Sequence, residues 1–149
     1  MTKKQQNKID NVNIINLLPY FKFPHIVAKN VLIKVLAHFK YKPDTINIIF
    51  MNDHNIKSIN SKFLAHNYST DVISFKLNQV KAGSHKIIEA EIYIGVEEVK
   101  RNSLLYKTKF YHEIKRVIIH GTLHLVGFND NTKIKRDKMR TWEDYFLGM

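Results

Sequence analysis

Residues 110–130 constrain the fold of this chain most, because they combine an apolar helical pattern with two histidines on one helix face. His120 and His124 stand four residues apart, which places their imidazoles one turn apart on the same side of a helix. Gly127 is suited to end that helix in a left-handed conformation. Asp130 follows just beyond the turn, where its carboxylate can return to the histidine pair. We therefore predict a central helix whose histidines lie at the floor of a cleft.

Two imidazoles and one carboxylate match the ligand set of a catalytic zinc site. They fill three tetrahedral positions and leave the fourth for water, whereas a structural site is closed by four protein ligands. A histidine pair at this spacing is, on its own, more often incidental than metal-binding. The helix-ending glycine and the acidic residue after it shift the interpretation towards a metal site held by His120, His124 and Asp130.

Composition limits both the metal chemistry and the partner. The chain has no cysteine, so thiolate zinc sites, disulfides and cysteine nucleophiles are excluded. A formal net charge of +11 suits a polyanionic partner such as nucleic acid. The charge carries limited weight, because Lys, Ile and Asn are all abundant, as in chains encoded by A/T-rich codons.

Length and hydropathy predict a single domain over residues 1–149, with residues 1–10 as a flexible polar N-terminal arm. The apolar runs are too short to span a membrane. No long apolar stretch follows the basic N-terminus, as it would in a signal peptide. We therefore expect a cytoplasmic protein.

The periodicity of apolar residues predicts an α+β fold, with about four strands in a mixed sheet and about five helices packed over it. The last two strands are expected to pair as an antiparallel hairpin through a loop at 78–86. Lys42-Pro43-Asp44 is expected to form a turn, and Asp53 and Thr132 are expected to cap helices. The expected strands are 12–18, 45–50, 71–77 and 87–94, and the expected helices are 24–39, 53–64, 95–105, 110–125 and 132–146.

Three motifs resemble those of a known family, in the same order and at compatible spacing. The first is His120-Gly-x-Leu-His124-Leu-x-Gly127, with a ligand residue at position 130. The second is the strand Thr70-Asp71-Val72-Ile73-Ser74-Phe75, and the third is Glu91-Ile92-Tyr93-Ile94 with the helix after it. Over residues 45–146 the chain resembles the YbeY family of bacterial endoribonucleases.

The resemblance implies a zinc-dependent endoribonuclease that is specific for single-stranded RNA. It implies a role in 3′-end maturation of 16S ribosomal RNA and in ribosome quality control, in the bacterial cytoplasm. The implied cofactor is one Zn²⁺ per chain, held by His120, His124 and Asp130. The implied partners are single-stranded RNA, ribosomal RNA and the small ribosomal subunit, with no membrane and no disulfide partner.

The chain departs from the family pattern in three places. The family's Gly-Asp-Ile strand is Ala90-Glu91-Ile92 here. The third ligand is Asp130, where histidine is common; a carboxylate oxygen also binds zinc, and its harder character could admit other divalent metals. Leu64 stands where many members carry an arginine, a candidate phosphate contact. The candidate RNA-binding residues in this chain are Lys62, His66, Lys76 and Arg116.

The residues leave two mechanistic routes open. Hydroxide formed at the metal can attack the phosphorus, or the metal can polarise the phosphoryl group for attack by the 2′-OH that only RNA offers. Asp71 and Glu91 are candidate general bases besides that hydroxide.

Two alternative functions also remain open. One is a metallohydrolase of another substrate class, although Gly121 replaces the Glu of the peptidase motif His-Glu-x-x-His, which counts against a peptidase. The other is a ribosome-associated RNA-binding protein with a structural metal, which the missing arginine at Leu64 keeps open.

Overall fold

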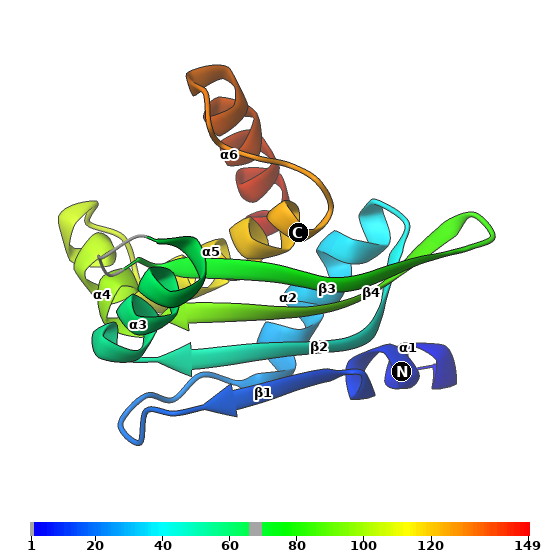
Figure 1. Ribbon diagram of the computed structural model, residues 1–149, viewed down its shortest axis with the longest axis horizontal. Coiled ribbons are helices and arrows are strands. Elements are labelled where there is room, and N and C mark those ends of the chain that lie inside the picture. The colour runs from blue at the N-terminus through cyan, green and yellow to red at the C-terminus, as the bar shows by residue number, and fades with distance from the viewer. Residues whose placement is uncertain (1, 66–69) are drawn as a thin grey trace.

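A computed structural model describes residues 2–65 and 70–149, which form six helices and four strands (Figure 1). The strands are β1 (Val12–Asn16), β2 (Tyr41–Met51), β3 (Val72–Ala82) and β4 (His85–Gly95). The helices are α1 (Lys3–Asp10), α2 (His25–His38), α3 (Asp53–Leu64), α4 (Val96–Leu105), α5 (Phe110–Leu125) and α6 (Lys133–Leu147). None of these described helices is long and apolar enough to pass through a membrane. The arrangement confirms the predicted α+β class, with six helices in place of about five.

The four strands form one mixed sheet in the order β1-β2-β4-β3. β1 and β2 are parallel, and so are β2 and β4, whereas β3 runs antiparallel to β4 as predicted. Parallel neighbours require a crossover connection, which α2 supplies between β1 and β2. The helices of the crossovers then cover the faces of the sheet.

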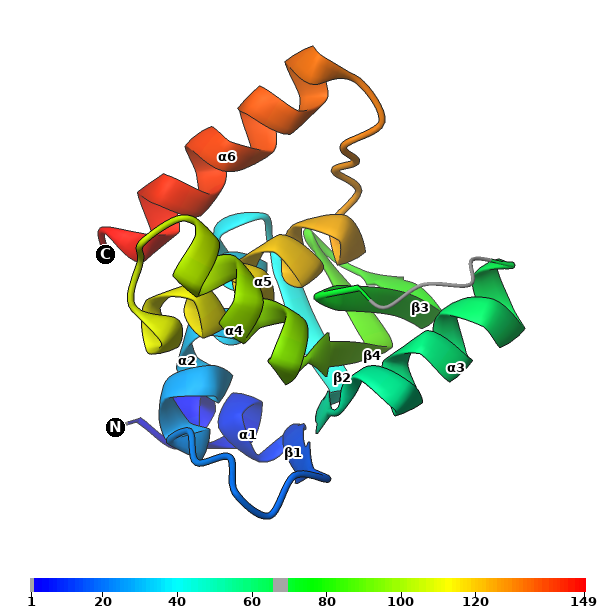
Figure 2. The same ribbon diagram turned by 90° about the vertical axis from the view of Figure 1, so that its left-hand side faces the viewer.

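The main hydrophobic core lies between one face of the sheet and helices α2 and α5. Alternate residues of β4 face this core, as the period of two along a strand requires. The residues between them face the other side, where Tyr93 packs with Ile56 of α3. Figure 2 shows α5 on one side of the sheet and α3 on the other. The core-facing residues of β4 are Ile88, Ala90, Ile92 and Ile94.

Helix α5 is central, as predicted: it contacts α2, α4, α6, β3 and β4. Ile114 and Ile118 belong to the main core, whereas Ile119 and Leu123 pack with side chains of α6. His120 and His124 lie on the remaining, partly exposed side of the helix. The packing of α5 therefore determines which way the histidines face.

Gly121 allows α5 to approach β3 closely. A Cβ at this position would lie 2.9 Å from Ser74 Oγ and 3.0 Å from a methyl group of Val72. The Ser74 hydroxyl also donates a hydrogen bond of 2.9 Å to the Gly121 carbonyl oxygen. Because α5 and β3 lie so close at Gly121, this position has no room for a side chain such as the glutamate of the peptidase motif.

Gly121→Ala should lower the free energy of unfolding by about 1–3 kcal/mol, because the added methyl group must push α5 away from β3. Urea denaturation followed by circular dichroism measures this loss. Gly148→Ala is the matched control, since its Cβ would meet backbone oxygens only at ordinary distances of 3.5 and 3.6 Å. Alanine favours helices over glycine, so a Gly121→Ala protein that gains stability would contradict the close approach.

The N-terminal segment differs from the predicted arm, because residues 3–10 form helix α1. Thr2 and Gln5 form a capping box: the Thr2 hydroxyl accepts from Gln5 N at 3.1 Å, and the Gln5 side chain accepts from Thr2 N at 2.8 Å. Ile9 is the buried residue of this helix. The polar composition of residues 1–10 hid both the capping box and the single buried position.

Two predicted irregular segments are strands instead. Lys42-Pro43-Asp44 lies within β2, beyond the end of β1, and the register shifts between Pro43 and Thr45. Pro43 is paired with Ile88 of β4 but has no partner on β1, and a proline without a donor N–H is tolerated beside such a one-sided, irregular pairing. The predicted loop 78–86 is mostly β3 and β4, with only Gly83 and Ser84 between them. Both arms there are largely exposed, so no apolar alternation marks them.

The two predicted helix caps differ in outcome. Thr132 caps α6 as predicted, because its hydroxyl accepts from Lys135 N at 3.2 Å. The cap of α3 is Asn52 rather than Asp53: the Asn52 side chain accepts from Asn55 N at 2.9 Å. Asp53 is instead the first helical residue, where an acidic side chain is favoured by the helix dipole.

Candidate metal centre

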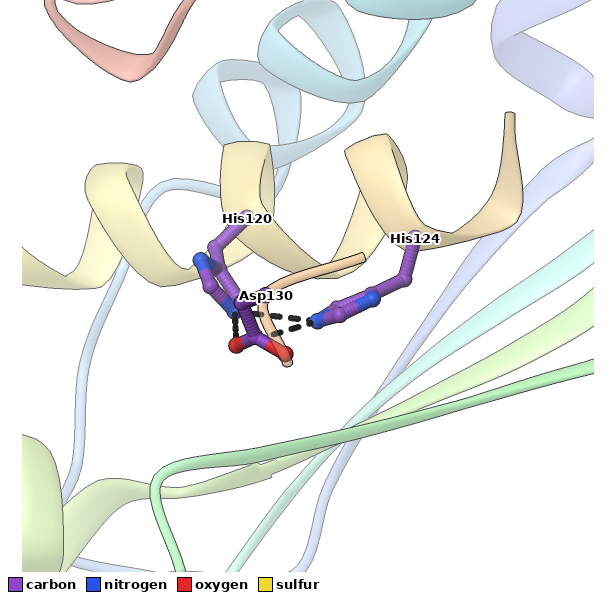
Figure 3. Close-up of side chains that lie close together, drawn as sticks. All are labelled: His120, His124 and Asp130. Carbon is purple, nitrogen blue, oxygen red and sulfur yellow. Dashed lines mark hydrogen bonds and ion pairs between the residues drawn. The ribbon is translucent and has the colours of Figure 1, made fainter. Parts of the chain in front are cut away.

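Helix α5 ends in a turn that carries Asp130 back to the two histidines. Gly127 has a φ of +103°, which confirms the predicted left-handed glycine. Its N–H donates to His124 O at 3.1 Å, and Phe128 N donates to Leu123 O at 3.0 Å. These are the two hydrogen bonds of a Schellman motif. As a result, the side chains of His120, His124 and Asp130 point toward one another (Figure 3).

One atom from each of these residues converges on a common point. His120 Nε2 lies 3.0 Å from His124 Nε2 and 3.3 Å from Asp130 Oδ2, and His124 Nε2 lies 3.7 Å from the same oxygen. Zinc–ligand distances of about 2.0–2.2 Å would put tetrahedral ligand atoms roughly 3.3–3.6 Å apart. The three side chains therefore fit the spacing of a tetrahedral metal site, and they are the described residues that could hold a metal ion.

The other ring nitrogen of each histidine is held by an acceptor. His124 Nδ1 lies 3.1 Å from the Phe128 carbonyl oxygen, and His120 Nδ1 lies 2.8 Å from Glu143 Oε2. A carbonyl and an ionised carboxylate accept hydrogen bonds but cannot donate them, so both Nδ1 atoms carry the proton. In the neutral rings both Nε2 atoms then present lone pairs towards each other and towards Asp130. Such a group of three acceptors requires a cation, either a proton or a metal ion.

The two imidazoles differ in proton affinity. Burial opposes protonation of His120, but the hydrogen bond and charge of Glu143, with the charges of Asp71 and Asp130, outweigh it and raise its pKa above 6.5. Burial and the charge of His120 lower the pKa of His124. In the metal-free protein a first proton is therefore held by His120, and the second histidine stays neutral until the pH is lower.

Zinc affinity should fall as the pH decreases through the raised pKa of His120, because a proton then competes with the metal for this imidazole. Above that pKa the affinity should be flat; below it, the loss should be about tenfold per pH unit while one proton is displaced. Chelator competition between about pH 5 and pH 8 measures this, after correction for the chelator's own protonation. An affinity that is constant across the range would contradict the ligand role of His120.

The centre opens into a cleft of about 610 Å³ between α4, α5 and α6. His120 and Asp130 line it, together with Asp71 at the start of β3. Burial raises the pKa of the Asp71 carboxyl, and the nearby charge of His120 only partly offsets this. Glu143 and Arg116 stand in the same cleft and form an ion pair of 3.1 Å. A substrate that enters the cleft therefore meets His120 and Asp130 of the three convergent residues, with the Asp71 carboxyl in the same cleft.

Comparison with known proteins identifies the family. The family model described as Endoribonuclease YbeY matches residues 16–148. The chain belongs to the YbeY family. A relative named Endoribonuclease YbeY from Chloroherpeton thalassium is 39% identical over 114 residues, which cover 76% of this chain and 77% of that protein. Another from Karelsulcia muelleri is 40% identical over 102 residues, which cover 68% and 69%.

A solved structure supports the same fold. The solution structure of a protein from Thermotoga maritima is similar at a TM-score of 0.60 and 26% identity, over 92% of this chain and 89% of that one. The match to the family model confirms the family that the three sequence motifs predicted. All three motifs lie inside the matched range. Helix α1 precedes that range.

The structure gathers only some of the site residues predicted for this YbeY chain. Asp71 and Arg116 line the cleft of the metal centre. Glu91 instead lies on the α3 side of β4, where its carboxylate accepts a hydrogen bond of 3.0 Å from the Tyr93 hydroxyl. The geometry thus places one of the two candidate bases, Asp71, on the side of the metal centre.

Two of the predicted RNA-binding residues, Lys62 and Lys76, lie away from the cleft. Leu64 is exposed at the end of α3, and Lys62 extends over the Phe63 ring at 5.3 Å. Lys76 donates to Gln79 Oε1 at 2.7 Å, near the hairpin. His66 lies outside the described residues. Lys62 and Lys76 are not among the residues that line the cleft.

The residues that the sequence prediction missed are Glu143 and Arg140, both on α6. Glu143 accepts the His120 hydrogen bond, and Arg140 lines the cleft beside Arg136, which the sequence had offered only as part of a basic cluster with Lys133 and Lys135. One signal was present: Glu143 lies on the same face of α6 as Met139 and Phe146, four and three residues away, and all three are buried. A carboxylate on the buried face of a helix requires a partner inside the protein.

Proposed function

We propose that this protein is a zinc-dependent endoribonuclease that cleaves single-stranded RNA. We further propose that it acts on 16S ribosomal RNA at its 3′ end, in association with the small ribosomal subunit, in the bacterial cytoplasm and in ribosome quality control. Membership of the YbeY family supports the reaction class. The family resemblance supports the ribosomal substrate and the compartment.

The observation that carries the proposal is the convergence of three acceptor atoms beside an open cleft. His120, His124 and Asp130 would hold one zinc ion, and among the described residues they form the whole ligand group. Three protein ligands leave a coordination position for water or substrate, which is the pattern of a catalytic site. This favours an enzyme over an RNA-binding protein whose metal is structural.

The chain's own residues divide the remaining work. When bound, zinc supplies Lewis acidity that acidifies a water molecule and polarises a phosphoryl oxygen. Glu143 holds the His120 ring so that Nε2 faces the metal position. Asp71, with its raised pKa, can hold or accept a proton at its carboxyl oxygen in the same cleft. We therefore assign proton transfer to Asp71 in preference to Glu91, which faces α3.

A direct assay compares substrates with the purified protein. Metal is removed with a chelator and zinc is restored, and the protein is incubated with a labelled single-stranded RNA, the same RNA in a duplex, the corresponding DNA strand and casein. We expect cleavage of the single-stranded RNA only, lost with the chelator and regained with zinc. A precursor 16S 3′-end fragment, free and within small subunits, tests the ribosomal assignment. Casein hydrolysis or equal cleavage of the duplex would overturn the proposed specificity.

A further inference from the structure

Two arginines of α6 line the cleft of the metal centre without a carboxylate partner. Arg136 and Arg140 are both exposed residues of the cleft lining, one helical turn apart. In the described part of the chain, neither takes part in an ion pair within 4.0 Å. Their charges are therefore available to a ligand in the cleft.

The other cation in the cleft is already engaged. Arg116 forms ion pairs of 3.1 Å with Glu143 and 3.0 Å with Asp144, and its Nε lies 3.8 Å from Glu113. Releasing Arg116 to a substrate would leave the buried carboxylate of Glu143 with less compensation. Arg116 is therefore suited to supporting the site, and the free positive charge belongs to α6.

The acidic residues of the cleft do not cancel that charge. Glu113 and Glu143 lie beside Arg116. Asp137 is paired with Lys133 at 2.8 Å, which lowers its pKa more than the charges of Arg136 and Arg140 do. Asp130 faces the two histidines and the proposed metal. Asp71 precedes β3 and so belongs to a different element of the cleft wall from the arginines of α6. The carboxylates that line the cleft are Asp71, Glu113, Asp130, Asp137 and Glu143.

The two arginines are also placed next to the reaction centre. Arg136 Nη1 donates to the Asp130 backbone oxygen at 3.4 Å, which puts its guanidinium beside a proposed metal ligand. Arg140 follows about 6 Å further along the axis of α6. The pair thus extends from the metal position along one wall of the cleft. An anionic chain bound at the metal would pass both side chains.

We propose that Arg136 and Arg140 bind successive backbone phosphates of the RNA, on one side of the bond that is cleaved. This inference rests on the proposed function and adds the residues that hold its substrate. A guanidinium matches two non-bridging phosphate oxygens with a planar pair of N–H donors. Leu64 cannot provide such a contact, and the pair on α6 supplies the positive charge on the side of the metal centre.

Binding measured without cleavage tests the proposal. Fluorescence anisotropy with a labelled single-stranded RNA, in the presence of a chelator, gives Kd over a range of salt concentrations. Arg136→Gln and Arg140→Gln should each weaken binding about tenfold. Each should also flatten the slope of log K against log salt by about 0.7, the value for one lost phosphate contact on a single strand. The double variant should flatten it by about 1.4.

Lys135→Gln is the matched control, because it removes one positive charge from the exposed surface of the same helix but not from the cleft. Its salt slope should equal that of the wild-type protein, and zinc affinity should be unchanged in all variants. Equal effects of Lys135→Gln and Arg140→Gln would overturn the proposal while leaving the nuclease assignment intact. So would a loss of zinc affinity in the arginine variants, which would mean that they act through the ligand turn. A wild-type protein that neither binds nor cleaves the RNA would sink both proposals.

Discussion

His124→Ala should reduce cleavage of single-stranded RNA by more than about a hundredfold and abolish stoichiometric zinc binding. The His124 Nε2 atom is one of three convergent acceptors, 3.0 Å from its partner on His120. Two remaining ligands cannot hold zinc in the three-ligand arrangement on which the proposed reaction depends. The measurements are initial cleavage rates with the zinc-loaded proteins and metal analysis after dialysis.

His54→Ala provides the control for removing an imidazole from this chain, because His54 is an exposed residue of α3 on the other side of the sheet. It should keep both the activity and the zinc of the wild-type protein. Thermal unfolding of the metal-free proteins checks that His124→Ala is folded. If folded His124→Ala cleaves RNA as fast as the wild-type protein, the activity is a contaminant and the metal assignment fails. If cleavage persists in protein without bound zinc, the nuclease activity does not depend on the metal.

The elements near the site were predictable because their signals are local. The apolar pattern of α5, the i, i+4 histidines and Gly127 all lie within one continuous stretch, and the Schellman turn needs nothing else to bring Asp130 back. The sequence predicted the hairpin of β3 and β4 only over the part in which one face of the strands is buried. Its exposed outer half lacks the alternation that marks a strand, and it was predicted as a loop.

The rest of the site depends on how α6 packs, which no local pattern specifies. Met139 and Phe146 pack with Ile119 and Leu123 of α5, and this contact turns one face of α6 towards the metal centre. Only then does Glu143, 23 residues after His120, reach Nδ1 of that histidine. The sequence alone could not say which basic residues of α6 enter the cleft.

Glu143→Ala should weaken zinc binding by about 10- to 100-fold, the usual effect of removing the hydrogen-bond partner of a metal-ligating histidine. The Glu143 carboxylate lies 2.8 Å from His120 Nδ1 and is nearly buried, so it both orients the ring and increases the basicity of Nε2. Glu143→Gln can keep an acceptor oxygen near Nδ1 but loses the charge, so its effect should be smaller. Chelator competition measures the zinc affinity of each protein directly, without an activity assay.

Asp144→Ala separates the histidine contact from the ion pair with Arg116. Asp144 is the next residue on α6 and also pairs with Arg116, at 3.0 Å, but it is largely exposed and makes no contact with His120 among the described interactions. Glu143→Ala and Asp144→Ala each remove one ion-pair partner of Arg116. Only Glu143→Ala also removes the hydrogen bond to the His120 imidazole. Equal zinc affinities of the two variants would therefore show that Glu143 serves the fold rather than the metal. A large loss in Glu143→Ala, a partial one in Glu143→Gln and none in Asp144→Ala is the order that the hydrogen bond requires.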